Sequence, residues 1–381
     1  MFPGNRDVAE LTDWRRKLHR QPELSGEEAS TAKEVASFLS ETRPDSIVTG
    51  IGGHGLAAIY EGRESGPTVL FRAELDALPI EDIADVPHRS AVPGKGHLCG
   101  HDGHMAILAC LGRGLGRERP RRGRAVLMFQ PAEETGAGAA AVIADPKFSG
   151  IAPDFAFSLH NMPGIPFGRV ELRIGPVNCA SRGMKITLSG KTAHASMPET
   201  GVSPMSAVAR LMPALTGLGK GNIGTADFAM ATVTHATMGA AAFGVAPGHA
   251  EIWATLRTLT DGGMDALVAS AEALARREAE AAGLACVISY HDIFRHCEND
   301  AEAVEHLRRA LDAEGVAHEP GQPLRASEDF GRFGDGARSA MLFLGAGMDY
   351  PALHNPDYDF PDGLIAVGAR VFMRTARDLL G

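Results

Sequence analysis

The stretch Arg124-Ala125-Val126-Leu127-Met128-Phe129, followed at once by Gln130-Pro131-Ala132-Glu133-Glu134, indicates how this chain folds. Its first part is apolar enough for a buried β-strand, and two carboxylates come directly after the end of that strand. Two other apolar stretches are followed in the same way by an acidic residue or a histidine: residues 68–73 by Glu74 and Asp76, and residues 155–159 by His160. Helical stretches lie between them. This order predicts an open α/β sheet, in which ligands bind outside the carboxyl ends of the strands.

The pattern changes between Cys179 and His291. Strand-like and helical stretches follow one another there in the order βαββαβ, which is the ferredoxin-like arrangement. The α/β pattern then resumes and continues to a closing helix at residues 363–380. We therefore expect a catalytic α/β domain with a mostly parallel central sheet, made of residues 1–178 and 293–381. A ferredoxin-like domain, residues 179–292, is expected to interrupt it.

Composition narrows the class of protein. A chain of 381 residues with 44% hydrophobic and 22% charged residues is typical of a globular protein with two domains. The net charge of -10 argues against general binding of nucleic acid, and no apolar stretch has the length of a membrane span. The start of the chain lacks the apolar core of a signal peptide, and the five cysteines are scattered. These features predict a cytoplasmic location.

A second stretch, Gly96-His97-Leu98-Cys99-Gly100-His101-Asp102-Gly103-His104, carries candidate metal ligands. It brings a thiol, imidazoles and a carboxylate into nine residues, and thiolate and neutral imidazole are good ligands for zinc and its neighbours. A glycine-rich polar turn with incidental histidines is the alternative that this stretch alone leaves open.

Candidate ligands from loops and strand ends add up to five residues: Cys99, His101, Glu134, His160 and His354. A structural zinc site needs four ligands and has no use for adjacent glutamates. Five candidates indicate two metal ions about 3.5–4 Å apart, or one ion with a partly open coordination shell.

The adjacent carboxylates of Glu133 and Glu134 can diverge at the end of a strand. One can then bind a metal while the other faces a metal-bound water and acts as a general base. The alternative is a solvated surface pair, since most acidic residues are exposed. The position directly after an apolar strand favours the functional interpretation.

Together these motifs resemble the M20 metallopeptidase family. Within that family the chain is most similar to the amidohydrolase branch, which contains hippurate hydrolases, N-acyl-amino-acid amidohydrolases and auxin-conjugate hydrolases. The similarity extends from His19 to the closing helix. The motifs that carry it are Arg72-Ala-Glu-Leu-Asp76-Ala-Leu-Pro79, Cys99-Gly-His-Asp-Gly-His104, Gln130-Pro-Ala-Glu-Glu134, Leu159-His-Asn161, Gly190-Lys-Thr-Ala-His-Ala195, Ala326-Ser-Glu-Asp-Phe330 and Leu353-His-Asn-Pro356.

The resemblance implies a catalytic domain with an inserted lid, and a homodimer or a tetramer formed through the lid. It also implies one or two divalent ions (zinc, manganese, cobalt or nickel) bound by the five candidate ligands above. Glu133 would be the general base, and Asp76 the carboxylate that orients the metal site. A thiolate ligand favours zinc, nickel or cobalt over manganese, although availability can override that preference.

Two residues of the inserted domain complete the expected site. The resemblance implies that His194 stabilises the oxyanion across a dimer, while a capped loop histidine is the alternative. Arg257 is the best candidate for binding a substrate carboxylate, since guanidinium binds carboxylate bidentately, but it can also be a surface strand arginine. The run Gly244-Val245-Ala246-Pro247 replaces an asparagine-containing run of many relatives, so the substrate or oxyanion contact credited to that asparagine is missing.

We therefore expect an enzyme that hydrolyses the amide bond of N-acyl amino acids, hippurate-like or related conjugates, with Glu133 as general base. Its partners would be small-molecule substrates, without nucleic acid or membrane. One alternative is a dipeptidase or metallocarboxypeptidase that uses the same site. Another is a non-catalytic binding protein that contains a metal, because fold alone does not determine function.

Overall fold

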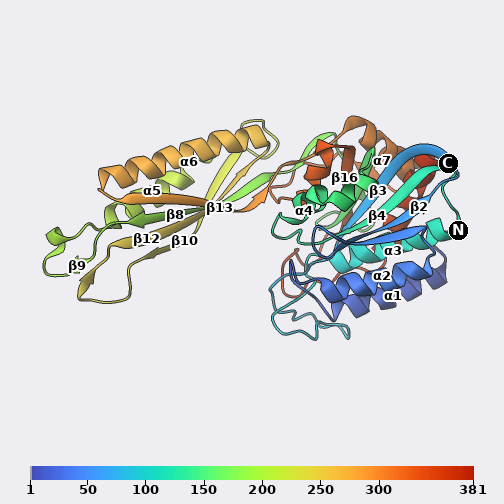
Figure 1. Ribbon diagram of the computed structural model, residues 1–381, viewed down its shortest axis with the longest axis horizontal. Coiled ribbons are helices and arrows are strands. Elements are labelled where there is room, and N and C mark those ends of the chain that lie inside the picture. Colours follow the sequence, from blue (N-terminus) through green and yellow to red (C-terminus); the bar gives the residue numbers. More distant parts are fainter. Residues whose placement is uncertain (1) are drawn as a thin grey trace. The chain divides into compact units, whose positions relative to one another are not determined.

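The chain forms two compact units in the computed structural model, which describes residues 2–381 (Figure 1). The first consists of Met1–Gly175, Glu298–Gly321 and Asp329–Gly381, and the second of Pro176–Cys297 and Gln322–Glu328. The short segment Gln322–Glu328 joins the second unit because the backbone N–H of Cys179 donates to the carbonyls of Leu324 and Ala326. Across residues 2–381, no helix combines the length and the apolar character that a membrane crossing requires.

The first unit is built on an eight-stranded sheet, whose four central strands β4, β3, β5 and β16 run parallel. Strands β1 and β2 add an antiparallel edge beside β4, and β6 pairs antiparallel with β16 on the other side. This sheet confirms the expected α/β class. The strands, in their order across the sheet, are β1 (Ser46–Ile51), β2 (Gly55–Glu61), β4 (Arg122–Gln130), β3 (Glu64–Glu74), β5 (Phe155–Pro163), β16 (Arg338–Gly347), β6 (Val170–Glu171) and β15 (His318–Glu319).

Helices enclose the main core of this unit. Alternate residues of the central strands, such as Val69 and Phe71 in β3 or Leu127 and Phe129 in β4, belong to one buried cluster with the helices, as the period of two in a strand requires. The helices of that cluster are α1 (Asn5–His19), α2 (Ala29–Glu41), α3 (His101–Arg117), α7 (Ala301–Ala313) and α8 (Leu364–Leu380). A shorter helix, α4 (Gly138–Ala144), and the 3₁₀ helices η1 (Pro146–Ile151) and η3 (Asp329–Asp335) contact one another elsewhere in the unit.

Strand register brings the expected site segments to one edge of the sheet. Glu74 of β3 lies opposite Gln130 of β4, so the segments that follow both strands leave the sheet side by side. The expectation that the third strand stops before His160 is wrong, because β16 pairs with β5 as far as Pro163 and His160 lies opposite Phe343. The apolar stretch of residues 105–115 predicts a helix, and helix α3 begins four residues earlier, at His101.

The second unit has the expected ferredoxin-like order. Its four strands form an antiparallel sheet in the order β10-β12-β8-β13, and helices α5 and α6 cover one face of it (Figure 1). A small two-stranded sheet of β9 (Ala193–His194) and β11 (Val245–Ala246) carries His194. The main elements are β8 (Ala180–Ser189), α5 (Met205–Thr216), β10 (Ala229–Met238), β12 (His249–Thr258), α6 (Asp261–Ala281) and β13 (Ala285–Phe294), and the remaining elements of the chain are β7 (Gly175–Asn178), η2 (Pro198–Thr200) and β14 (Cys297–Asn299).

Candidate metal centre

Six of the expected site residues come together in the first unit. They lie in the segments that follow β3, β4 and β16, at the end of β5, and at the start of α3. Three groups of potential ligand atoms consist of these residues alone, and within each group the atoms lie within 4.8 Å of one another: Cys99–His101–His160, Cys99–Glu134–His354 and His101–Glu133–Glu134. Cys99 is shared by two of the groups, and so are His101 and Glu134.

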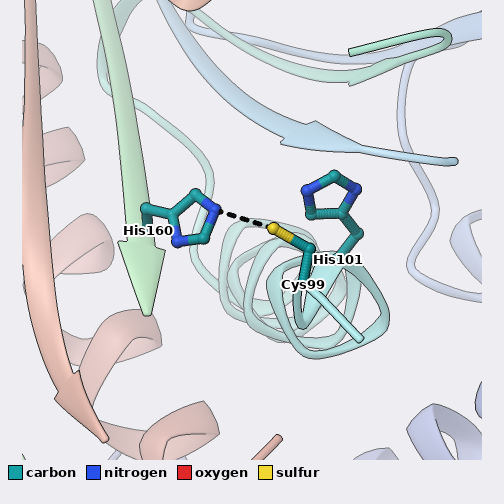
Figure 2. A group of neighbouring side chains, drawn as sticks. All are labelled: Cys99, His101 and His160. Atoms are coloured by element: carbon teal, nitrogen blue, oxygen red, sulfur yellow. Dashed lines mark hydrogen bonds between the residues drawn. The ribbon is translucent and has the colours of Figure 1, made fainter. Parts of the chain in front are cut away.

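The thiol of Cys99 points toward the ring of His160, and His101 extends beside it from the start of α3 (Figure 2). Cys99 Sγ is 3.4 Å from His160 Nε2. Two ligands bound tetrahedrally to one zinc ion at its usual bond lengths lie about 3.3–3.6 Å apart. The pair therefore has the spacing that a shared cation requires.

Both histidines present the same nitrogen to this cluster. His160 donates its Nδ1–H to the carbonyl of Asn161 at 2.7 Å, and His101 donates its Nδ1–H to the carbonyl of Asp76 at 2.8 Å. Because a carbonyl can only accept, Nδ1 carries a proton in each ring, and Nε2 is the nitrogen left to face the cluster. A histidine that ligates a metal through one nitrogen typically donates the other N–H in this way.

The Nε2 atom of His101 is the clearest sign that the residues fit a cation. It is buried and has no hydrogen-bond partner among residues 2–381. It lies 4.0 Å from Glu133 Oε2 and 3.9 Å from Glu134 Oε1, and His354 Nε2 lies 3.7 Å from Glu134 Oε2. These distances are too long for hydrogen bonds but close to the spacing of ligands around one ion. Imidazole, thiolate and carboxylate together suit zinc and its neighbours.

Asp76 connects two of the candidate ligands from behind. Its Oδ2 accepts hydrogen bonds from the Ser25 hydroxyl at 2.6 Å and from the backbone N–H of Glu134 at 3.0 Å. Its backbone carbonyl holds the ring of His101, as described above. Burial would raise the pKa of Asp76, but the bonds from His101, Ser25 and Glu134 lower it, so Asp76 remains an anion beside the cluster. These contacts with His101 and Glu134 are those expected of a carboxylate that orients metal ligands.

The protonation of the cluster depends on a cation. Burial raises the pKa of Cys99 well above its usual value, and the charge of Glu134 raises it further. Burial lowers the pKa of His160 to about 3. The protein alone therefore holds a neutral thiol beside a neutral imidazole. Since a thiol must lose its proton to bind a metal, loading a cation is expected to release one.

The neighbouring His104 is excluded as a ligand by its own hydrogen bonds. Its Nδ1–H donates to Glu74 at 2.7 Å, and its Nε2 accepts the backbone N–H of Asn161 at 3.1 Å. Glu74 in turn pairs with the buried guanidinium of Arg72. Sequence reasoning placed Glu74 at the end of a strand and Asn161 in a motif, but it gave neither residue a role in the site.

The two remaining site residues belong to the second unit. His194 is exposed, and its Nδ1 accepts from the Ser196 hydroxyl at 2.7 Å and from the Ser196 backbone N–H at 3.1 Å, so its proton is on Nε2. The run Gly244–Pro247 lies next to it, because Val245 of β11 pairs with His194. Arg257 is half-buried and donates to the Arg325 carbonyl and the Ser327 hydroxyl, so it is more than a solvated surface arginine.

Comparisons with known proteins identify the family of the chain. Residues 70–378 match the family model described as peptidase family M20/M25/M40. The chain is 30% identical to a hippurate hydrolase of Campylobacter jejuni, over 95% of this chain and 94% of that one. It is also 30% identical to thermostable carboxypeptidase 2 of Saccharolobus solfataricus, with the same shares covered.

A solved structure is similar over the whole length. The crystal structure of a dinuclear metal-binding peptidase of the M20 family from Bacillus subtilis is 25% identical, covers 99% of each chain and superposes with a TM-score of 0.84. The chain therefore belongs to peptidase family M20/M25/M40, within the amidohydrolase branch, and is a metal-dependent hydrolase.

Proposed function

We propose that this enzyme hydrolyses the amide bond between an acyl group and an amino acid, with Cys99, His101, Glu134, His160 and His354 as metal ligands and Glu133 as general base. The observation that carries the proposal is the buried Nε2 of His101, which faces both Glu133 and Glu134 without a hydrogen-bond partner in the described chain. The hippurate hydrolase relative, whose name specifies an acyl amino acid, supports the substrate class.

Divalent ions in such a site supply Lewis-acid polarisation of the carbonyl and acidify the attacking water. Glu133 takes the proton of that water and then passes it to the leaving amine. General acid–base catalysis of this kind typically contributes 10²–10⁴-fold. The backbone N–H of Ala132 donates to the buried carboxylate of Glu28 at 2.8 Å, and this bond helps to hold the left-handed backbone before Glu133, where Ala132 has a φ of 50°.

His194 is proposed as the donor to the oxyanion, and Arg257 as the group that binds the substrate carboxylate. The tautomer of His194 supports this role. Ser196 donates to Nδ1, so the ring carries its proton on the exposed Nε2, which can donate it. A preorganised donor to an oxyanion contributes about 2.7–4 kcal/mol. We also propose a homodimer through the second unit, where the apolar side chains of Phe243, Val245, Trp253 and Val287 are exposed. Sedimentation as a monomer would contradict the dimer.

A matched pair of variants tests the role of Glu133. Glu133→Gln removes the base but no metal ligand, so metal content is expected to stay at the wild-type level while kcat on hippurate falls by about 10²–10⁴-fold. Glu134→Gln makes the same chemical change one residue later and is expected to lower metal content as well. Turnover by Glu133→Gln at the wild-type rate would remove Glu133 as the base.

A carboxypeptidase is the second candidate function, because thermostable carboxypeptidase 2 of Saccharolobus solfataricus has the same 30% identity to this chain as the hippurate hydrolase. Both reactions can use the same ligands and base. N-acetyl and N-benzoyl amino acids, dipeptides and longer peptides, assayed side by side with the metal-loaded enzyme, separate them. Turnover of the peptides alone would contradict hydrolysis of N-acyl amino acids.

A further inference from the structure

The buried side chain of Asn161 joins two candidate metal ligands. Asn161 follows His160 directly in β5, and its Nδ2 donates to the carbonyl of Cys99 at 2.9 Å. Its backbone N–H donates to His104, and its Oδ1 accepts a hydrogen bond from the hydroxyl of Tyr358. Asn161 therefore contacts the backbone of Cys99 and is joined to His160 by a peptide bond. The side chains of Cys99 and His160 face each other in Figure 2.

The hydroxyl of Tyr358 fixes which way this carboxamide points. A carboxamide donates from its nitrogen and accepts at its oxygen, and the carbonyl of Cys99 can only accept. With Tyr358 donating to Oδ1, Nδ2 must face Cys99. Both Asn161 and Tyr358 are fully buried, so without the tyrosine hydroxyl the oxygen would lose a partner that water does not readily replace. A buried acceptor without a partner is unfavourable, and rotation or displacement of the amide would relieve that cost.

The loop that carries Cys99 is packed directly against the same carboxamide. Gly100 has a φ of +89°, and a Cβ at that position would lie 2.3 Å from Asn161 Oδ1. Neither the conformation nor the space suits a larger residue. The backbone on either side of the peptide bond between Cys99 and Gly100 thus contacts Asn161, by a hydrogen bond on one side and by close packing on the other. A shift of the carboxamide must therefore shift the loop.

We propose that Asn161 and Tyr358, named here the carboxamide clamp, are positioning residues that hold Cys99 Sγ at the distance from His160 Nε2 at which both bind one cation. The inference rests on the proposed function for the role of Cys99 as ligand, and it adds the residues that determine where the thiolate stands. The clamp touches neither the substrate nor the cation. It acts through the backbone of Cys99 and through the ring of His160, whose Nδ1 lies 3.2 Å from Asn161 Nδ2.

Cobalt(II) provides a readout that does not depend on activity, because a thiolate bound to Co²⁺ gives a sulfur-to-cobalt charge-transfer band in the near ultraviolet. The metal-free wild type and the variants Tyr358→Phe and Asn161→Asp are titrated with Co²⁺ in the presence of a competing chelator. We expect both variants to show a weaker or shifted band and a Co²⁺ affinity about 10–100-fold lower, the usual effect of removing a residue that supports a ligand.

The matched control is Tyr350→Phe, which removes a hydroxyl from the neighbouring ring, 5.9 Å from that of Tyr358 between centroids. This control is expected to keep the wild-type band and affinity. Thermal unfolding of the metal-free proteins shows whether each variant is folded. If Asn161→Asp does not fold, the test rests on Tyr358→Phe, which is the milder change.

A wild-type band and affinity in folded Tyr358→Phe would overturn the clamp and leave the proposed function intact. Absence of a sulfur band in the wild type itself would overturn both the clamp and the assignment of Cys99 as a ligand. A weakened band in Tyr358→Phe, with the Tyr350→Phe control unchanged, establishes the clamp.

Discussion

Replacement of His19 by glutamine should make the stability of the first unit less dependent on pH. His19 ends α1 and is fully buried, with its Nδ1 2.8 Å from Asp102 Oδ2 and its Nε2 3.2 Å from Asp82 Oδ2. Burial would lower the pKa of His19, but the charge of Asp102 and the bonds to Asp102 and Asp82 raise it to about 9. The imidazolium is thus the favoured form in the folded protein.

The size of the stability effect follows from this raised pKa. A change in the pKa of His19 from 6.5 to about 9 on folding corresponds to about 3 kcal/mol of unfolding free energy. Because the folded pKa is the higher one, the contribution is fully present below the unfolded value of 6.5 and is lost as the pH rises through about 9. His19→Gln should therefore destabilise the unit by about 3 kcal/mol more near pH 6 than near pH 10.

Urea unfolding of metal-free protein measures this difference. Trp14 lies on the same helix as His19, and Trp253 in the second unit is the other tryptophan of the chain, so a Trp253→Phe background makes the fluorescence report the first unit alone. His318→Gln, which removes an imidazole paired with Asp312 near the surface, serves as the matched control. An equal loss of unfolding free energy by His19→Gln at both pH values would refute the linkage argument.

Two further predictions concern the proposed site. Cys99→Ser should weaken zinc binding more than manganese binding in a chelator competition, because it replaces a soft thiolate by a harder oxygen; unchanged affinity for both ions would mean that the thiol is not a ligand. Ser196→Ala removes one of two donors to His194 Nδ1, so kcat should fall about fivefold, the equivalent of one ordinary hydrogen bond, with KM unchanged. Ser196→Thr should retain the wild-type kcat, and a change in KM alone would contradict the proposed role.

The fold could be predicted where local patterns and tertiary structure agree. Apolar runs such as 124–129 gave the central strands, and the βαββαβ order gave the second unit, since both signals are contained in short stretches of sequence. The end of β5 was missed because pairing with β16 carries it past polar residues that otherwise end a strand. The contribution of Gln322–Glu328 to the second unit was missed because it depends on backbone bonds to Cys179, far away in the sequence.

Part of the site could also be predicted from the sequence. Thiol, imidazole and carboxylate side chains indicate metal binding by their chemical type, so the six clustered residues could be named as candidates. The residues that hold them were not: Ser25, Glu28, Asn161 and Tyr358 are ordinary polar residues whose partners lie far along the chain, such as Tyr358, 197 positions from Asn161. No local pattern distinguishes a serine that binds Asp76 from one in a solvated turn.

The arrangement of the ligand groups favours two cations over one. A single tetrahedral zinc ion takes four ligands, whereas five candidate ligands surround this site, and an open position would still be needed for substrate. Cys99 belongs to one group with His101 and His160 and to another with Glu134 and His354. Those two groups have only the thiol in common, and a thiolate carries enough charge to bind an ion on each side. Two ions held by these two groups would use all five residues and leave Glu133 for the water, and the similar M20 peptidase of Bacillus subtilis is described as dinuclear.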